Sequence, residues 1–103
     1  MRILRVYMHG KPAGDLRQLD TSRYEFIYDA DYAGVAVSRT MPVSARPFSF
    51  VGFPSFFDGL LPEGVQLDQL LRQRKIDASD KMSQLAAVGE DLVGAVTVLD
   101  PCL

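Results

Sequence analysis

The sequence predicts an α+β fold: a small, curved, mostly antiparallel β-sheet, shaped as a partial barrel, with about three short helices between the early strands and the last one. Two observations support this prediction. Apolar residues alternate with polar residues in the first half of the chain and recur at helical spacing in the second half. A β-rich segment at 93–99 follows the helices and must pair with the early strands, because a lone strand is not stable. Residues 1–103 are therefore expected to form a single domain.

Four strands are expected before the helices. Leu4, Val6 and Met8 share one face of the first strand, and a turn at 9–12, with a positive φ at Gly10, joins it to the second. Aromatic residues at alternate positions predict the third. The expected strands span residues 3–8, 13–19, 24–29 and 35–39, and the prolines that interrupt the ladder are Pro42 and Pro47.

Two helices are predicted after these prolines. The first spans 53–61 and opens at Pro54 or Ser55, since proline is tolerated in a first turn. The second starts at Pro62 and places Glu63 in its first turn, where a carboxylate interacts favourably with the helix dipole. Three leucines at helical spacing follow within 67–71.

A third helix leads into the last strand. Ser79 is its expected N-cap, with Asp80 favourably placed against the helix dipole. The segment 89–96 is interpreted as a tight helix-to-strand connection, in which Gly94 permits a close approach of two backbone segments. The residues expected on the buried face of the helix and at its end are Met82, Leu85, Ala86 and Gly89.

The composition argues against several classes of function. The net charge is −2 and the pI is near 5.2, so the chain lacks the cationic excess on which nucleic-acid binding depends. The first residues lack the apolar segment of a signal peptide, and no run approaches the ~18 apolar residues that a membrane span needs. A single cysteine fits a reducing compartment. The protein is therefore expected in the cytoplasm, without contact to membranes and without direct contact to nucleic acid.

The sequence shows no pattern of catalytic or metal-ligating residues. The only histidine, His9, lies in a turn, and the only cysteine, Cys102, lies beside the C-terminus, so neither has the partners that a nucleophilic site needs. Asp29 and Asp31 have the spacing of calcium ligands, but the glycine and the distal glutamate of a calcium loop are absent. The segment 89–96 lacks the Gly-Lys-Ser/Thr of a phosphate loop. We expect no enzyme activity, no cofactor and no metal ion.

Apolar residues are concentrated in the middle of the chain. Five phenylalanines lie within 48–57, and most of them must belong to the core of so small a domain. The segment Phe56–Val65, hereafter the Phe56–Val65 corner, contains two adjacent apolar pairs whose members point in different directions on a helix, followed by a proline and a glycine. These residues alone leave two interpretations open, a core cluster and a surface that docks on a partner.

Three segments of the chain resemble the N-terminal subdomain of HipA-type serine/threonine kinases. Residues 56–63 match F-F-[DE]-[GN]-L-L-P-[ED] of that family. Residues 4–14 are similar to its opening hairpin, with V-G or A-G after the turn, and residues 88–96 are similar to its closing [IV]-G-x-D-x-V-G-A-V. The segments follow the family's order and spacing and together cover essentially the whole chain, so the resemblance is specific.

The resemblance implies a free-standing equivalent of this subdomain, similar to the HipS proteins of three-component toxin–antitoxin operons. HipA-type kinases continue into a kinase domain, whereas this sequence ends at Leu103. In those operons the small protein is an antitoxin that binds and neutralises a kinase toxin of the HipT type, and a helix-turn-helix protein of the HipB type binds DNA. We therefore expect a kinase-binding antitoxin that is linked to the DNA-binding protein only through a ternary complex. A structural or activating subunit that completes the kinase fold is the alternative.

The resemblance also places the partner-binding residues in the Phe56–Val65 corner. Many relatives carry a tryptophan at the position of Val65, so this chain buries less area there on a partner. The residues expected to bind the kinase are Phe57, Asp58, Leu61, Pro62, Glu63, Gly64 and Val65.

Overall fold

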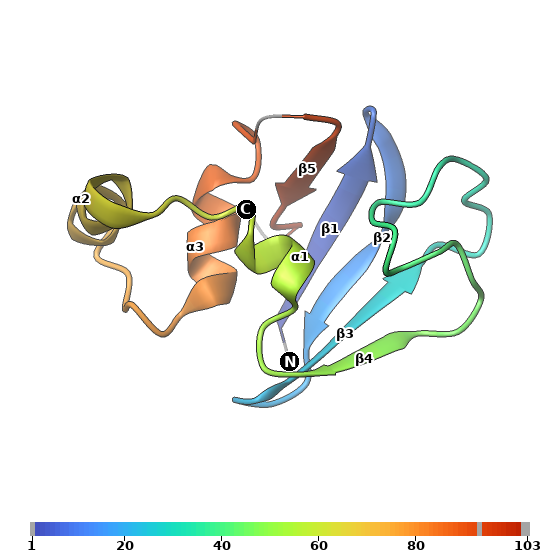
Figure 1. Cartoon of the computed structure of the whole chain (residues 1–103), viewed down its shortest axis with the longest axis horizontal. Coiled ribbons are helices and arrows are strands. Elements are labelled where there is room, and N and C mark those ends of the chain that lie inside the picture. Colours follow the sequence, from blue (N-terminus) through green and yellow to red (C-terminus); the bar gives the residue numbers. More distant parts are fainter. Residues whose placement is uncertain (1, 93, 102–103) are drawn as a thin grey trace.

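The computed structural model of the protein describes residues 2–92 and 94–101. Within them, five strands form one antiparallel sheet in the order β4-β3-β2-β1-β5, and three helices lie between β4 and β5 in the chain (Figure 1). The sheet is not closed, because β4 and β5 are its two edges. The predicted α+β class is thus confirmed. The elements are β1 (Arg2–Met8), β2 (Lys11–Gln18), β3 (Arg23–Tyr28), β4 (Phe48–Val51), α1 (Ser55–Asp58), α2 (Gly64–Arg74), α3 (Lys81–Val88) and β5 (Val96–Leu99).

One core lies between the sheet and two of the helices. Side chains at alternate positions of a strand point to the same face, and the apolar ones of β1, β2, β3 and β5 share one face of the sheet. This arrangement was predicted for β1 and β3. Phe57 of α1 and Met82 and Leu85 of α3 pack against that row. The strand residues with no more than 5% exposure in this core are Leu4, Val6, Ala13, Leu16, Tyr24, Phe26, Tyr28 and Val98.

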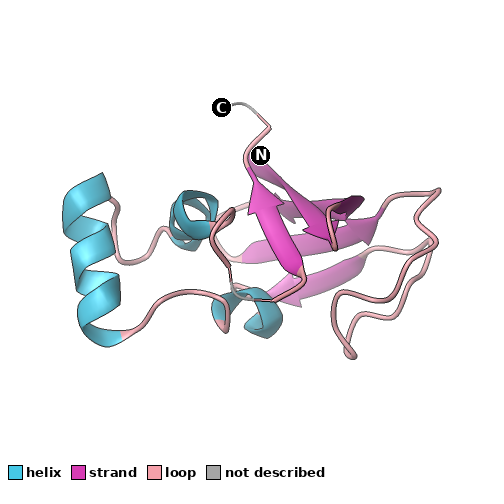
Figure 2. Ribbon diagram, turned by 90° about the horizontal axis from the view of Figure 1, so that it is seen from above, coloured by secondary structure: helices cyan, strands magenta, loops and turns pink. Residues whose placement is uncertain are grey.

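Helix α2 stands apart from this core. Figure 2 shows α2 at one end of the molecule and the loop at 29–47 at the opposite end. None of the residues 64–74 is buried, and the helix packs against α3 at a few positions. Among the described residues, no helix combines the length and the apolar character that crossing a bilayer requires.

The expected strand at 35–39 is not formed. Residues 29–47 make an irregular loop with one isolated bridge between Ser38 and Met41. The reason lies in Tyr28, whose buried hydroxyl accepts a hydrogen bond from Val37 N at 3.0 Å and donates one to Met41 O. A side chain therefore satisfies the backbone groups that a neighbouring strand would otherwise bind.

Strand β4 is not among the strands that the sequence predicts, because Phe48 and Phe50 belong to a cluster of phenylalanines that is expected in the core. It begins directly after Pro47 and pairs with β3 through Tyr24↔Phe50 and Phe26↔Phe48. A proline just outside an edge strand costs no ladder hydrogen bond, so the strand can start there.

Two predicted helix starts are wrong. Helix α2 begins at Gly64 rather than at Pro62, and Glu63 is its N-cap without a side-chain hydrogen bond. Helix α3 is capped by Asp80 rather than by Ser79. The Asp80 carboxylate accepts hydrogen bonds from both the amide (3.1 Å) and the hydroxyl (2.6 Å) of Ser83. A serine cap has a single side-chain oxygen, so it could not accept both hydrogen bonds equally well.

The close backbone approach in the last connection lies at Gly89, not at Gly94. A Cβ added at Gly89 would lie 1.8 Å from the carbonyl oxygen of Val98, whereas a Cβ at Gly94 would meet nothing within 4 Å. Gly94 is needed instead for its φ of +109°. Strand β5 begins at Val96, and Val93, the expected first residue of this strand, lies outside the described residues.

Candidate docking site

Two residues of the Phe56–Val65 corner anchor it in the core. Phe57 is fully buried, with its ring centroid 5.8 Å from that of Phe26 in β3. Leu61 is 8% exposed. Both are among the residues expected to contact a partner, and in this structure both side chains belong to the core cluster. They hold the corner in place and present little surface of their own.

The outward part of the corner runs from Asp58 to the first turn of α2. The Asp58 carboxylate is half-exposed and accepts a hydrogen bond from Lys81 Nζ at 3.0 Å, which ties α1 to α3. Glu63 and Gly64 are exposed, and Gly64 has a φ of +61°, a conformation in which a side chain would be strained. Val65 follows with 72% of its surface exposed. The chain thus turns sharply and displays a valine at the start of α2.

A shallow groove of about 400 Å³ lies beside this corner. One wall is formed by the corner itself and the other by the end of α3 and the connection to β5. The motifs at 56–63 and 88–96 are therefore neighbours in space, although residues 64–87 separate them in the sequence. Sequence spacing alone could not predict that these two motifs lie side by side. The signal available in the sequence was that both motifs belong to the pattern of one family. The residues that line the groove are Gly59, Leu60, Leu61, Pro62, Gln66, Val88, Asp91 and Leu92.

Helix α2 extends the exposed surface. Its leucines at 67, 70 and 71 are only half-buried. At its C-terminal end, Arg72, Arg74 and Lys75 form no side-chain hydrogen bond or ion pair with any other described residue. Cations are favoured there by the helix dipole, so their position has a local explanation.

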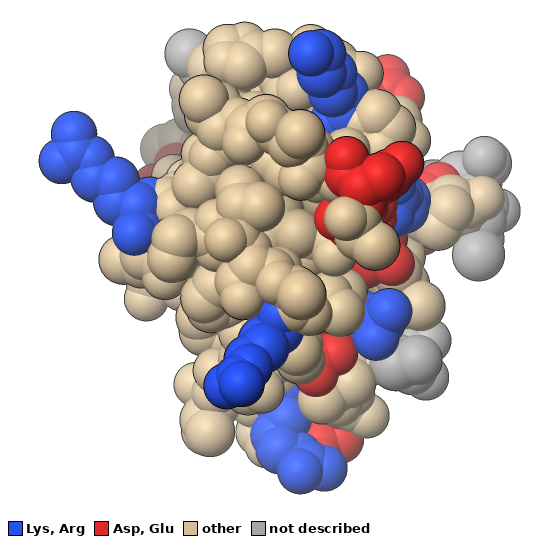
Figure 3. All heavy atoms as spheres, turned by 90° about the vertical axis from the view of Figure 1, so that its right-hand side faces the viewer, with Lys and Arg blue, Asp and Glu red and all other residues tan. Residues whose placement is uncertain are grey.

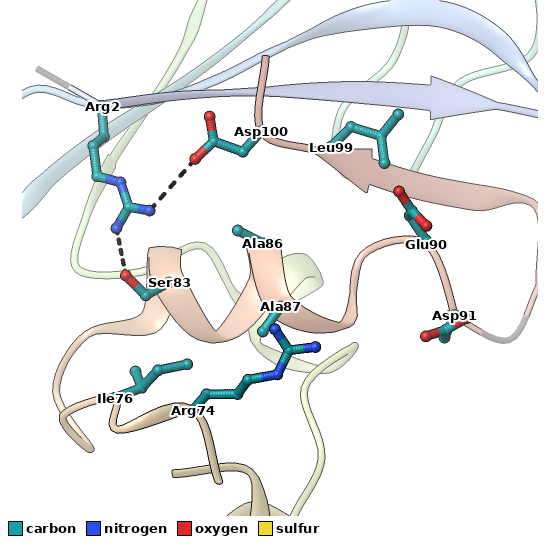
Figure 4. A pocket seen from close by; sticks show the side chains of 10 residues that line it. All are labelled: Arg2, Arg74, Ile76, Ser83, Ala86, Ala87, Glu90, Asp91, Leu99 and Asp100. Atoms are coloured by element: carbon teal, nitrogen blue, oxygen red, sulfur yellow. Dashed lines mark hydrogen bonds and ion pairs between the residues drawn. The ribbon is translucent and has the colours of Figure 1, made fainter. Parts of the chain in front are cut away.

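A larger hollow lies on the other side of α3, and Arg2, one of the residues that line it, is bound within the protein. Arg2 donates a hydrogen bond to the Ser83 hydroxyl at 2.6 Å and lies 3.7 Å from the Asp100 carboxylate (Figure 4). Arg2 also contacts Asp80, the N-cap of α3, at 3.4 Å. These contacts fasten β1 to α3 and to the segment after β5, which gives Arg2 a structural role.

The charged groups on the outer face of the sheet are also paired. The Arg5 guanidinium donates to Asp15 at 2.5 Å and to both oxygens of Asp29 at 3.0 and 2.7 Å. The hydrogen bond from Arg5 holds the pKa of Asp29 below its usual value, and the bond to Asp29 raises the pKa of Arg5. The arrangement is a stabilising ion-pair network across β1, β2 and β3.

Of the histidine and the cysteine considered for nucleophilic chemistry, only His9 lies among the described residues. His9 lies exposed in the β1–β2 turn with a φ of +51°, and Cys102 lies outside the described residues. Among the described residues there is no group of three or more histidine, cysteine or acidic side chains that could hold a metal ion. The corner, the groove and α2 together form a largely exposed surface.

The strand order and the three helices define the class: a small α+β domain with an open, five-stranded antiparallel sheet. A solved structure described as the N-terminal domain of HipA toxin superimposes with a TM-score of 0.74 and 28% sequence identity, over 96% of this chain and 92% of that chain. The sequence profile of the family described as HipA N-terminal domain matches residues 4–99. The chain belongs to the HipA N-terminal domain family.

Two relatives differ in what accompanies the domain. An uncharacterised protein of Haemophilus influenzae is 32% identical over 94 residues, which cover 91% of this chain and 88% of that protein. Y4dM of Sinorhizobium fredii, which is described as a kinase, is 31% identical over 107 residues, 93% of this chain. The match spans only 26% of the length of Y4dM, about a quarter.

Proposed function

We propose that this protein is an antitoxin that binds a cognate HipA-like serine/threonine kinase and neutralises it by protein–protein contact. The distribution of the domain among its relatives carries this proposal. The domain fills 88% of the Haemophilus protein, whereas it makes up about a quarter of Y4dM, which is described as a kinase. The same domain thus occurs joined to a kinase chain and largely by itself. A domain that is joined to a kinase within one chain in one relative can bind a kinase that is a separate chain in another system.

The contact surface that we propose is the outward part of the Phe56–Val65 corner, with the groove beside it. Phe57 and Leu61 fix this corner from below, and the proline at 62 limits its freedom. A surface that is already ordered loses little conformational entropy on binding. Asp58, Glu63 and Val65 then supply two carboxylates and one apolar side chain to the partner.

Val65 is the most exposed apolar side chain of this surface, at 72%. Burying it against the kinase contributes about 1 to 2 kcal/mol, the usual amount for an aliphatic side chain of this size. This contribution is smaller than that of the tryptophan present in many relatives, so the groove and α2 must supply more of the binding free energy here.

A structural or activating subunit is the second candidate. Y4dM favours it, because in that protein the same domain is part of a chain described as a kinase. Both candidates predict binding to the kinase, and they differ in the effect on its activity.

The test is a titration of the purified kinase from the neighbouring open reading frame with this protein, measuring the affinity by calorimetry and the phosphorylation activity of the kinase. A complex with reduced activity supports the antitoxin. A complex with unchanged or increased activity supports the subunit. No complex at micromolar concentration would exclude both.

Two valine variants locate the surface. Val65→Asp should weaken the complex at least about tenfold, because it places a carboxylate where an apolar contact is required. Val51→Asp is the matched control, since Val51 is 90% exposed on the edge strand β4, away from the corner. If both variants weaken binding equally, or neither does, the contact surface lies elsewhere.

A further inference from the structure

Helix α2 is held to the rest of the domain mainly at its two ends. Before the helix, Leu61 is buried in the core cluster. After it, the buried Gln84 of α3 donates hydrogen bonds from Nε2 to the carbonyl oxygens of Asp77 and Ala78, both at 3.1 Å. Between these two anchors lie residues 62–76, hereafter the α2 strap, of which α2 itself contains no buried residue.

The backbone of the α2 strap turns sharply at each end of the helix. Gly64, the first helical residue, has a φ of +61°, and Lys75, the C-cap, is left-handed with a φ of +54°. A helix of 11 residues is marginally stable by itself, so α2 depends on its packing against the domain. That packing is limited to a few positions on α3. The helix can therefore rotate about the line between its two anchors at small cost.

The space between α2 and α3 leaves room for such a rotation. A hollow of about 640 Å³ is lined by Arg74 at the end of α2 and by two small side chains of α3, Ala86 and Ala87. The three leucines of α2 are its only residues that are not exposed, so they mark the face that α2 turns to the domain. Within the described part of the chain, none of these leucines packs against the core cluster. Moving α2 towards α3 would bury more of their apolar surface, which is favourable.

Charges of opposite sign lie on different walls of this hollow. Arg74 extends from the end of α2 along α3, and Glu90 and Asp91 lie in the connection after α3 (Figure 4). With respect to the described residues, none of these three side chains forms an ion pair. Opposite charges are in contact elsewhere, and Figure 3 shows carboxylates next to lysine and arginine side chains at the end opposite α2. Closing the hollow would bring the unpaired charges together.

We propose that the α2 strap is a hinged element that closes over the hollow against α3, so that Arg74 pairs with Glu90 and Asp91. The helix turns about the two residues of positive φ at its ends. Because Val65 lies in the first turn of α2, closing also displaces this exposed valine relative to the groove beside the Phe56–Val65 corner. The movement belongs to this chain alone and requires no kinase.

Amide hydrogen exchange of the full chain, followed by NMR at about 50 mM salt, tests the closing movement. The hydrogen-bonded amides of α2 should exchange at least about a hundredfold faster than those of α3, because few buried contacts hold the strap. Arg74→Glu should speed exchange in α2 by about a further fivefold, since it replaces an attraction by a repulsion. Lys75→Glu is the matched control. It reverses the neighbouring charge, which does not line the hollow, and should change exchange in α2 by less than about twofold.

The variant Arg74→Glu/Glu90→Lys/Asp91→Lys restores opposite charges across the hollow and should return exchange in α2 to within about twofold of the unmodified protein. At about 500 mM salt the effect of Arg74→Glu should fall below about twofold, because the charges are screened. Exchange in β1 should stay unchanged in every variant, since all the substituted residues are exposed.

Exchange in α2 as slow as in α3 would overturn the hinged strap. Equal effects of Arg74→Glu and Lys75→Glu, or no recovery in the triple variant, would overturn the closing contact. Kinase binding is measured separately, so either result leaves the proposed function standing.

Discussion

Gly89→Ala should destabilise the protein strongly, because Gly89 is where the end of α3 meets β5. An added Cβ would lie 1.8 Å from the carbonyl oxygen of Val98 and 2.7 Å from its carbonyl carbon, whereas ordinary contact starts at 3.4 Å. Both atoms belong to the backbone, so β5 must move by about 1.6 Å, and the hydrogen bond from Val98 N to Gly89 O at 3.0 Å is lost. Overpacking and the lost hydrogen bond together should lower the free energy of unfolding by about 3 kcal/mol.

Urea unfolding followed by far-ultraviolet circular dichroism measures this loss, which corresponds to a melting temperature lower by about 12 to 20 °C. Gly94→Ala is the matched control in the same connection. There a Cβ would meet nothing within 4 Å, so only the φ of +109° is strained, at a cost of about 1 to 2 kcal/mol. A loss below about 1 kcal/mol for Gly89→Ala, or a larger loss for the control, would refute the close approach as described.

Three further changes have distinct expected outcomes. Asp29→Asn removes a carboxylate whose pKa is lowered by the hydrogen bond from Arg5. Because its folded pKa lies below its unfolded value, the pair stabilises the fold above about pH 4, and this contribution is lost as the pH falls through the folded pKa. The variant should be about 1 to 2 kcal/mol less stable at pH 7 in urea titrations, with a smaller difference below about pH 4; a constant difference would contradict this. Tyr28→Phe leaves two loop backbone groups unpaired and should cost about 1 to 3 kcal/mol and speed proteolytic cleavage within 29–47, whereas unchanged cleavage would mean that the loop is held otherwise. Leu61→Asp should lower the free energy of unfolding by more than about 3 kcal/mol and Val65→Asp by less than about 0.5 kcal/mol, and similar losses in both would show that the corner is not anchored as the burial indicates.

The strands of the hairpin and of β3 could be predicted because their information is local. Side chains at alternate positions face opposite sides of a strand, and Leu4, Val6 and Phe26 follow that rule. The segment at 35–39 has the same local signal and forms no strand. Its amide at Val37 is taken by the hydroxyl of Tyr28, nine residues earlier. Nothing in the pattern of 35–39 itself indicates this competing hydrogen bond.

The position of the candidate site stays a prediction, and the sequence did not indicate which of its side chains face outward. Motif and composition both pointed to the Phe56–Val65 corner. The burial of Phe57 depends on how α1 sits on β3, which is a tertiary contact. The same holds for Leu92, which lies at the groove beside Pro62 because α3 and its connection fold back to the corner. Sequence spacing carries no information on either contact.

The most direct test of the proposed antitoxin role is the activity of the cognate kinase measured at increasing concentrations of this protein. We predict that phosphorylation falls towards zero as the protein saturates the kinase, and that Val65→Asp needs about tenfold more protein for the same effect while Val51→Asp does not. A complex that forms with the same affinity but leaves the kinase equally or more active would contradict neutralisation.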